Sequence, residues 1–324
     1  MQVRRLTNPS EVARAAPALA RLQNVALAGA PLPRPVQAEE VARAAWDDPH
    51  LTDRMLLVAM EGVTLTGWLH LAPPGRRAAL GHLCPYVGGE AVPLPGAALT
   101  ADDRQGQQAA THLYEAALQA WSAAGQLHLD FALPAGADAS PSLAGREAAP
   151  AEHLALYAAP LDAAPLTRSP VSLRPARPED LPEIVALARE AGEVDEQFTP
   201  QDLQRLMRAV PGPNDKGLLV AERHGVAVAY VVGIMDDAHN RAAAVRRAWV
   251  ALGTLGLGVS REAQDLELHR SLLQGVMLLL IPRGATELAL LVNQQMAESL
   301  RDVWRTLGFR RRAEWILRRV ATGR

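Results

Sequence analysis

A repeated segment constrains the fold of this chain more than any other feature. The stretch RLTNPSEV at residues 5–12 resembles RPARPEDL at residues 174–181. Each copy follows a short strand-like stretch and places proline near a helix start, with acidic residues in the first turn, where the helix dipole favours them. The copies lie about half the chain apart, which indicates an internal duplication. The 324 residues also suffice for two domains of ordinary size.

Charge and cysteine content exclude several classes of protein. The net charge of −2 gives no reason to expect a nucleic-acid partner. Cys84 is the only cysteine, so an intramolecular disulfide, a CxxC pair and a multi-cysteine metal site are impossible. Residues 1–10 lack the apolar core of a signal peptide, and the apolar run 276–281 is too short to span a bilayer. We therefore expect a cytoplasmic protein with no membrane partner.

The second half predicts one domain from 170 to 324. Apolar runs on both sides of Arg223-His-Gly225 indicate a hairpin, and Gly308 is a typical helix-ending glycine. The expected strands cover 171–174, 217–222, 226–235, 249–259, 287–292 and 311–320, and the expected helices cover 178–191, a segment opening at 199, 266–282 and 294–307.

The first half predicts a similar domain from 1 to 163, with an alanine- and proline-rich boundary at 159–170. Glu61-Gly62 is the expected hairpin turn. The expected helices cover 9–26, 36–46 and 107–123, and the expected strands cover 54–60, 63–71, broken material in 80–99, 126–133 and 152–158. The helix expected between the last two strands is short or missing.

This order of elements resembles the GNAT acetyltransferase superfamily, twice over. The residues that carry the resemblance are LVN at 291–293, Met296, LGF at 307–309 and Trp315, with GQQAATHL at 106–113 in the first half. The resemblance implies an α/β fold of the α+β type, in which two tandem GNAT-like domains each have a mixed central sheet flanked by helices. The arrangement is similar to that of mycothiol synthase.

The resemblance also implies acetyl-CoA as acyl donor, held by a splayed strand and by a loop of pattern Arg/Gln-x-x-Gly-x-Gly/Ala. Glycines let the backbone approach the pyrophosphate, and N–H groups at a helix start bind the anion. In the second half Gln264 matches the first position of this loop pattern. Asp265 and Glu267 would place negative charge beside the pyrophosphate, and His269 replaces the small residue at the last position. Val259, Gln264 and Asn293 are the implied contacts of this weaker site.

In the first half the same loop is neutral and keeps one glycine. It is the predicted cofactor site, and the residues that it contributes are Gln105, Gly106, Gln107, Gln108, Ala109 and Ala110.

The catalytic acid and base are not assigned by the pattern. Many family members place a tyrosine in the fourth helix, where this chain has Trp304, and indole is no acid at neutral pH. Glu90, Tyr86 and His82 are candidates near the central strands of the first half. Their alternative interpretation is that of strand-edge or solvated residues.

Other polar clusters have simpler interpretations. The nine histidines form no spaced ligand set, and Asp236 to His239 is typical of a polar turn, so no metal is expected. The arginines at 310–312 and 318–319 suit a solvated strand flank, an acidic partner or the 3′-phosphate of CoA.

Two functions remain open. The first is an acyl-CoA-dependent N-acetyltransferase that acts on a small amine or a peptide amine, with at least one degenerate cofactor site. The second is a catalytically inactive GNAT-fold binding or scaffold protein. The sequence leaves monomer and homodimer equally open.

Overall fold

The computed structural model describes eleven stretches of the chain. They are residues 1–26, 37–42 without 40, 55–71, 98–100, 104–125 without 124, 128–134, 149–162, 171–209 without 195 and 197, 217–235, 246–250 and 256–322. Cys84, Glu90, Tyr86, His82, Asp236 and His239 lie outside the described residues, as does most of the helix expected at 36–46.

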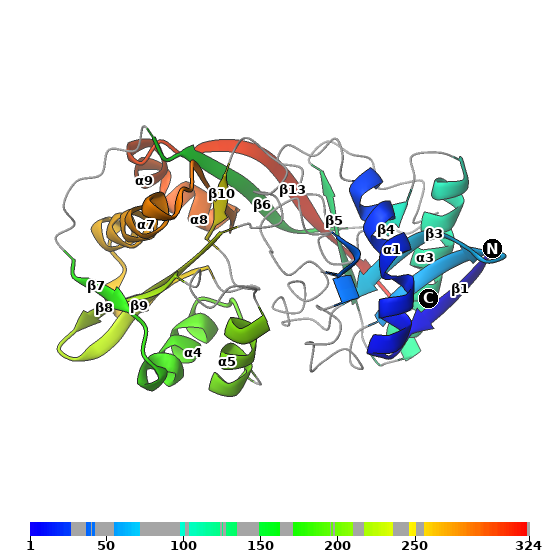
Figure 1. The fold of residues 1–324 in the computed structure, drawn as a ribbon, viewed down its shortest axis with the longest axis horizontal. Coiled ribbons are helices and arrows are strands. Elements are labelled where there is room, and N and C mark those ends of the chain that lie inside the picture. Colours follow the sequence, from blue (N-terminus) through cyan, green and yellow to red (C-terminus); the bar gives the residue numbers. More distant parts are fainter. Residues whose placement is uncertain are drawn as a thin grey trace.

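The N-terminal half contains one four-stranded antiparallel sheet in the order β1-β2-β3-β4. Two helices flank it, one on each face (Figure 1). The elements are β1 (Gln2–Leu6), α1 (Pro9–Ala26), β2 (Met55–Glu61), β3 (Thr64–Leu71), β4 (Ala98–Thr100), α3 (Arg104–Ala123), β5 (His128–Pro134) and β6 (Ala149–Pro160).

Alternation along β2 and β3 explains why both faces of this sheet are covered. Leu56, Val58 and Trp68 face α1, whereas Leu57 and Leu69 face α3. Successive strand residues point to opposite faces, so a strand that is apolar at every position must be buried on both.

The C-terminal half repeats this layering. Its elements are β7 (Leu173–Pro175), α4 (Leu181–Glu190), α5 (Pro200–Ala209), β8 (Gly217–Arg223), β9 (Val226–Met235), β10 (Arg247–Trp249), β11 (Leu257–Val259), α7 (Leu266–Leu280), β12 (Glu287–Asn293), α8 (Gln294–Ser299), α9 (Arg301–Thr306) and β13 (Arg310–Ala321). The helices α4 and α5 cover one face of the sheet, and α7 and α9 cover the other.

Glycine allows α7 to lie close to its sheet. A Cβ atom at Gly233 on β9 would lie 2.6 Å from Val276 of α7, and one at Gly217 on β8 would lie 2.3 Å from Leu279. Only a residue without a side chain permits that approach.

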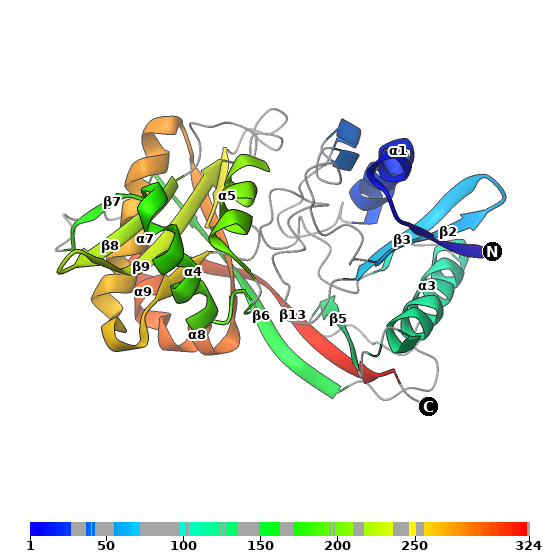
Figure 2. The same ribbon diagram turned by 90° about the horizontal axis from the view of Figure 1, so that it is seen from below.

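The two halves exchange their last strands. β6, which ends the N-terminal half, pairs with β12 of the C-terminal half, and β13 pairs with β5 of the N-terminal half. β6 and β13 also pair with each other, so the nine-stranded sheet contains the order β5-β13-β6-β12. The long strands β6 and β13 run between the N-terminal and C-terminal halves, and the C-terminus lies beside the N-terminal half (Figure 2). The domain boundary at 163–170 remains a prediction, and backbone hydrogen bonds cross it.

The fold class expected from the sequence is the one observed. Both hairpins are confirmed, with positive φ at Gly62 and Gly225, and the helix at 9–26 has the expected ends. No helix among the described residues is long and apolar enough to cross a membrane.

Three local predictions were wrong. The strand expected over 249–259 is two separate strands, β10 and β11. The helix expected over 294–307 is broken at Leu300, whose φ of −104° and ψ of 20° interrupt the α-helical path. The helix expected from 107 begins at Arg104, so the predicted cofactor residues 105–110 lie in the first turns of α3 and not in a loop before it.

Candidate functional site

The site predicted in the N-terminal half lies where a sheet edge meets a helix start. Among the described residues, β4 pairs only with β3, and the next strand, β5, pairs with β13. The outer edge of β4 therefore carries backbone groups without a described strand partner. Only residues 101–103 separate β4 from α3, so the start of this helix lies close to the edge.

The predicted cofactor residues divide between the two sides of α3. Gly106, Ala109 and Ala110 lie on its buried side, where Ala109 belongs to a cluster with Leu57 and Leu69. The remaining three are exposed glutamines at 105, 107 and 108.

The start of α3 carries Arg104, an exposed cation, followed by uncharged residues. Its first turn carries no acidic residue, and the first four N–H groups of any helix lack acceptors within that helix. The Gln105 side-chain amide donates to the Glu61 carboxylate in the β2–β3 hairpin. Asp102 and Asp103 precede the helix and lie outside the described residues. A helix start with one cation and small buried residues is suited to an anionic phosphate group.

In the C-terminal half two neighbouring strands splay apart. β10 runs parallel to β12 as far as the pair Trp249 and Ala289, and the Val250 N–H still donates to Ala289 at 2.8 Å. Among the described residues, β11 then pairs only with β9. The edge of β11 that faces away from β9 therefore has no described strand partner.

Two carboxylates occupy that edge. Gly256 and Ser260 bond to β9 through Val232 and Val228, and alternate residues of an antiparallel strand bond to the same neighbour. The N–H groups of residues 257, 259 and 261 consequently point to the open side. Glu193 accepts from the Leu257 N–H at 3.3 Å, and Glu190 accepts from the Arg261 N–H at 2.7 Å.

Glu193 is held firmly where it lies. It also accepts from the Gly256 N–H at 3.2 Å and from the hydroxyl of Tyr230, whose side chain is fully buried. Burial, and the Glu193 carboxylate beside it, raise the pKa of the Tyr230 hydroxyl well above its usual value, so this group remains a donor. The sequence analysis missed Glu190, Glu193 and Tyr230. The one local signal was an acidic residue after Gly192, whose φ of 70° ends the preceding helix.

The start of α7 is also occupied by acidic groups. Asp265 is the N-cap, and its carboxylate accepts from the Leu268 N–H, the kind of donor that a phosphate needs. Arg223 pairs with Asp265 at 3.2 Å, and Glu267 pairs with Arg270. The His269 ring nitrogen Nδ1 lies 2.7 Å from the Asp265 carbonyl oxygen. The residues present here therefore do not fit a pyrophosphate group.

The other residues implied for this half serve packing and helix ends. Val259 is buried in the core, Gln264 is exposed, and Asn293 caps α8 by accepting from the Met296 N–H at 2.8 Å. Trp304 is 2% exposed and donates from Nε1 to the Ala297 carbonyl at 3.2 Å. Trp304 is therefore a core residue, as its size favours.

No metal centre is visible in the described part of the chain. Histidine, cysteine, aspartate and glutamate side chains form no group of three or more there that is placed to hold an ion.

Comparison with known proteins gives matches in structure. No protein-family model matches the sequence, and no curated protein matches it. A GCN5-related N-acetyltransferase from Sphaerobacter thermophilus has a TM-score of 0.66 at 18% identity, over 100% of this chain and 96% of that one. A tandem GNAT protein from the clavulanic acid biosynthesis pathway has a TM-score of 0.62 at 15% identity, over 100% and 99%.

A third similar structure is an N-myristoyltransferase from Saccharomyces cerevisiae with bound myristoyl-CoA. Its TM-score is 0.65 at 10% identity, over 99% of this chain and 79% of that chain. Identities this low show a shared fold, and a fold hosts many activities. The layered halves, the splayed strands and these similarities together show that the protein has a GNAT fold in tandem arrangement.

Proposed function

We propose that the protein is an acyl-CoA-dependent N-acetyltransferase that holds its acyl donor in the N-terminal half. The observation that carries this proposal is the start of α3, which carries Arg104 and no acidic residue in its first turn, beside the edge of β4 that has no described strand partner. The N–H groups at the helix start bind the pyrophosphate, and the edge of β4 supplies backbone partners for the amide groups of the pantetheine arm.

Electrostatics favour the N-terminal half over the C-terminal half. Two like unit charges about 4 Å apart repel by roughly 4 kcal/mol near a protein surface. Asp265 and Glu267 place two carboxylates at the start of α7, and their pairing with Arg223 and Arg270 reduces this cost for a phosphate there. The start of α3 carries the exposed cation Arg104 and exposed amides, with the Glu61 carboxylate bonded to Gln105. Glu190 and Glu193 further block the edge of β11. We therefore propose that the C-terminal site is degenerate and that this half stabilises the pair or shapes the acceptor pocket.

The acceptor in this proposal is a small amine or a peptide amine. Its nitrogen, after loss of a proton to a base, attacks the thioester carbon, the C–S bond breaks, and the thiolate takes up a proton from an acid. Glu90, Tyr86 and His82 remain the proposed candidates for these two roles, and all three lie outside the described residues.

A second candidate is a catalytically inactive GNAT-fold binding or scaffold protein. The observation that favours it is the set of bonds that Glu193, Glu190 and Asp265 make to N–H groups of the C-terminal site, where these carboxylates take the place of a ligand. If the N-terminal half were blocked in the same way, no acyl donor would bind.

The deciding experiment is calorimetric titration of acetyl-CoA into the protein and into Gln107→Glu/Gln108→Glu. Both glutamines are exposed, so the added charges leave the core intact, unlike a charge at the buried Gly106. Gln119→Glu, exposed near the other end of α3, is the matched control.

We expect micromolar binding to the unchanged protein and to the control, and at least about tenfold weaker binding to the double variant. An amine screen for release of free thiol then identifies the acceptor class. No binding at millimolar acetyl-CoA would overturn the enzyme proposal in favour of the inactive alternative. Equal binding to the double variant would show that the donor lies elsewhere.

A further inference from the structure

A trough on the outer surface of the C-terminal half is independent of both cofactor sites. Two adjoining pockets of about 400 and 520 Å³ share Tyr157 of β6 and Arg301 of α9. They lie between the helices α8 and α9 on one side and the exchanged strands β6 and β13 on the other. Pockets of this size suit a small organic molecule.

The larger pocket is cationic. Arg301, Arg305 and Arg310 line it, and no acidic residue does. Arg305 is paired with Asp302 at 3.1 Å. The guanidinium groups of Arg301 and Arg310 have no hydrogen-bond or ion-pair partner within the described part of the chain. Two exposed guanidinium groups at one pocket are therefore left to meet an anion, which they bind through charge-assisted hydrogen bonds.

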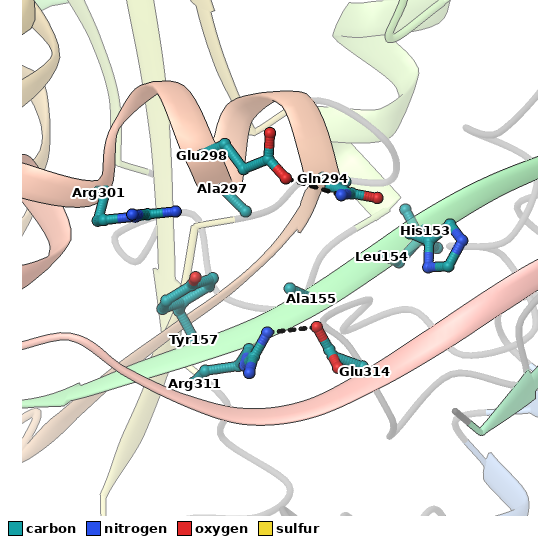
Figure 3. A pocket seen from close by; sticks show the side chains of 10 residues that line it. All are labelled: His153, Leu154, Ala155, Tyr157, Gln294, Ala297, Glu298, Arg301, Arg311 and Glu314. Carbon is teal, nitrogen blue, oxygen red and sulfur yellow. Dashed lines mark hydrogen bonds and ion pairs between the residues drawn. The ribbon is translucent and has the colours of Figure 1, made fainter. Parts of the chain in front are cut away.

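The nearby arginines differ because each has an acid. Arg311 pairs with Glu314 along β13 at the wall of the smaller pocket, and Arg312 lies 3.6 Å from Glu287. Of the three arginines at the start of β13, only Arg310 has a side chain without an acidic partner among the described residues, and Arg310 lines the larger pocket. Figure 3 shows Arg301 reaching across from α9 above Tyr157, with the Arg311–Glu314 pair on the strand side.

The floor between the two pockets is a rigid aromatic surface. The Tyr157 ring stacks on Trp304 with 5.4 Å between ring centroids and an interplanar angle of 26°. Trp304 packs edge-on against Phe309 at 5.6 Å and is held by its bond to Ala297. Tyr157 is only partly buried, so its other face is available to the body of a ligand.

We propose that this trough binds a small organic anion, a phosphate ester or a carboxylate with a planar body. Its anionic group lies between Arg301 and Arg310, and its body lies on Tyr157. The site gives a role to Arg310, whose side chain has no acidic partner among the described residues.

The test is calorimetric titration with phenyl phosphate, benzoate and the neutral benzyl alcohol. The variant is Arg301→Gln/Arg310→Gln, and Arg14→Gln, exposed on α1, is the control for loss of a positive charge. We expect one or both anions to bind, about tenfold or more weaker binding to the double variant, unchanged binding to the control, and weakening by salt.

The two anions separate the ligand classes, because preference for phenyl phosphate assigns a phosphate ester and preference for benzoate assigns a carboxylate. The inference is overturned if neither anion binds at millimolar concentration, if benzyl alcohol binds equally well, or if the double variant binds like the unchanged protein. Gln107→Glu/Gln108→Glu should retain full binding of these probes, which separates this site from the proposed donor site.

Discussion

Arg174 and Asp180 form a two-bond ion pair at the start of the first helical segment of the C-terminal half. The guanidinium Nη1 donates to Oδ2 at 2.7 Å and Nη2 donates to Oδ1 at 2.8 Å. Asp180 also accepts from the Arg177 N–H at 2.6 Å, and Arg174 Nε reaches Glu222 at 2.7 Å. One aspartate thus ties the strand β7 to the helix that follows it.

The N-terminal half has a counterpart at the same place. The Glu11 carboxylate accepts from the Thr7 N–H at 3.0 Å and lies 3.9 Å from Arg4. The Thr7 N–H bond, with Arg4 nearby, lowers the pKa of Glu11. An acid that folds back onto the chain before the first helix is therefore common to both halves, in agreement with the repeated segments of the sequence.

The Asp180 pair predicts a pH dependence of stability. The hydrogen bonds from Arg174 lower the pKa of Asp180 from 3.8 to about 2. A folded-state pKa below the unfolded value stabilises the protein above pH 3.8, and this contribution is lost as the pH falls toward 2. Asp180→Asn should lower the free energy of unfolding at pH 7 by about 1–2 kcal/mol, and by less near pH 3.

Urea unfolding at both pH values measures this difference. Asp302→Asn, whose side chain is 71% exposed, removes the same charge from a surface pair and should change stability by less than about 0.5 kcal/mol. A deficit of Asp180→Asn that is equally large near pH 3 would contradict the ion-pair explanation.

Replacing Gly308 should destabilise the protein only through the backbone conformation at this position. Its φ of 78° lies in the left-handed region, and a Cβ atom there would meet nothing within 4 Å. The following Phe309 N–H donates back to Trp304 at 2.8 Å and closes α9. Gly308→Ala should destabilise the protein by about 1 kcal/mol, and Gly308→Asn by less, because asparagine tolerates this conformation. Equal losses for both variants in urea unfolding would contradict this.

The sequence predicted correctly those helix starts and hairpin turns that are fixed by residues close together in the chain. The helix α1 begins at Pro9, the proline expected near a helix start, and Asn8 before it accepts from the Glu11 N–H at 3.0 Å. The hairpin at Arg223-His-Gly225 follows from the positive φ of its last two residues. In these places the residues that fix the backbone lie within a few positions of each other.

The sequence did not predict which strands pair when they lie far apart in the chain. The apolar strand at 149–160 reads the same whether it pairs within its own half or, as observed, between β12 and β13. Glu193 accepts a hydrogen bond from the N–H of Leu257, which lies 64 positions away in the sequence, and no local pattern connects the two residues. The acidic occupation of the C-terminal site was visible at Asp265 and Glu267 only because those two residues adjoin the expected loop.

Ser271 predicts a stabilising substitution. Its side chain lies in the middle of α7 and is 0% exposed, and its hydroxyl oxygen has no hydrogen-bond partner among the described residues. Ser271→Ala removes a buried hydroxyl that makes no hydrogen bond among the described residues, and alanine has a higher helix propensity than serine. The substitution should therefore stabilise the protein by about 0.5–1.5 kcal/mol. Ser299→Ala is the control, because that exposed hydroxyl donates to Met296 at 3.3 Å. A loss of stability on Ser271→Ala would show that the hydroxyl has a partner.

The exchanged strands predict that the two halves stay together after the chain is cut. A protease site inserted between residues 163 and 170 severs the connection, yet β6 remains bonded to β12 and β13 remains bonded to β5. The fragments should therefore co-elute in size-exclusion chromatography and unfold in one transition, with the uncut insertion variant as control. A fragment of residues 170–324 made alone should aggregate, because it exposes the edge of β12 that β6 normally covers. Fragments that separate in native buffer, or a soluble monomeric 170–324, would mean that each half completes its own sheet.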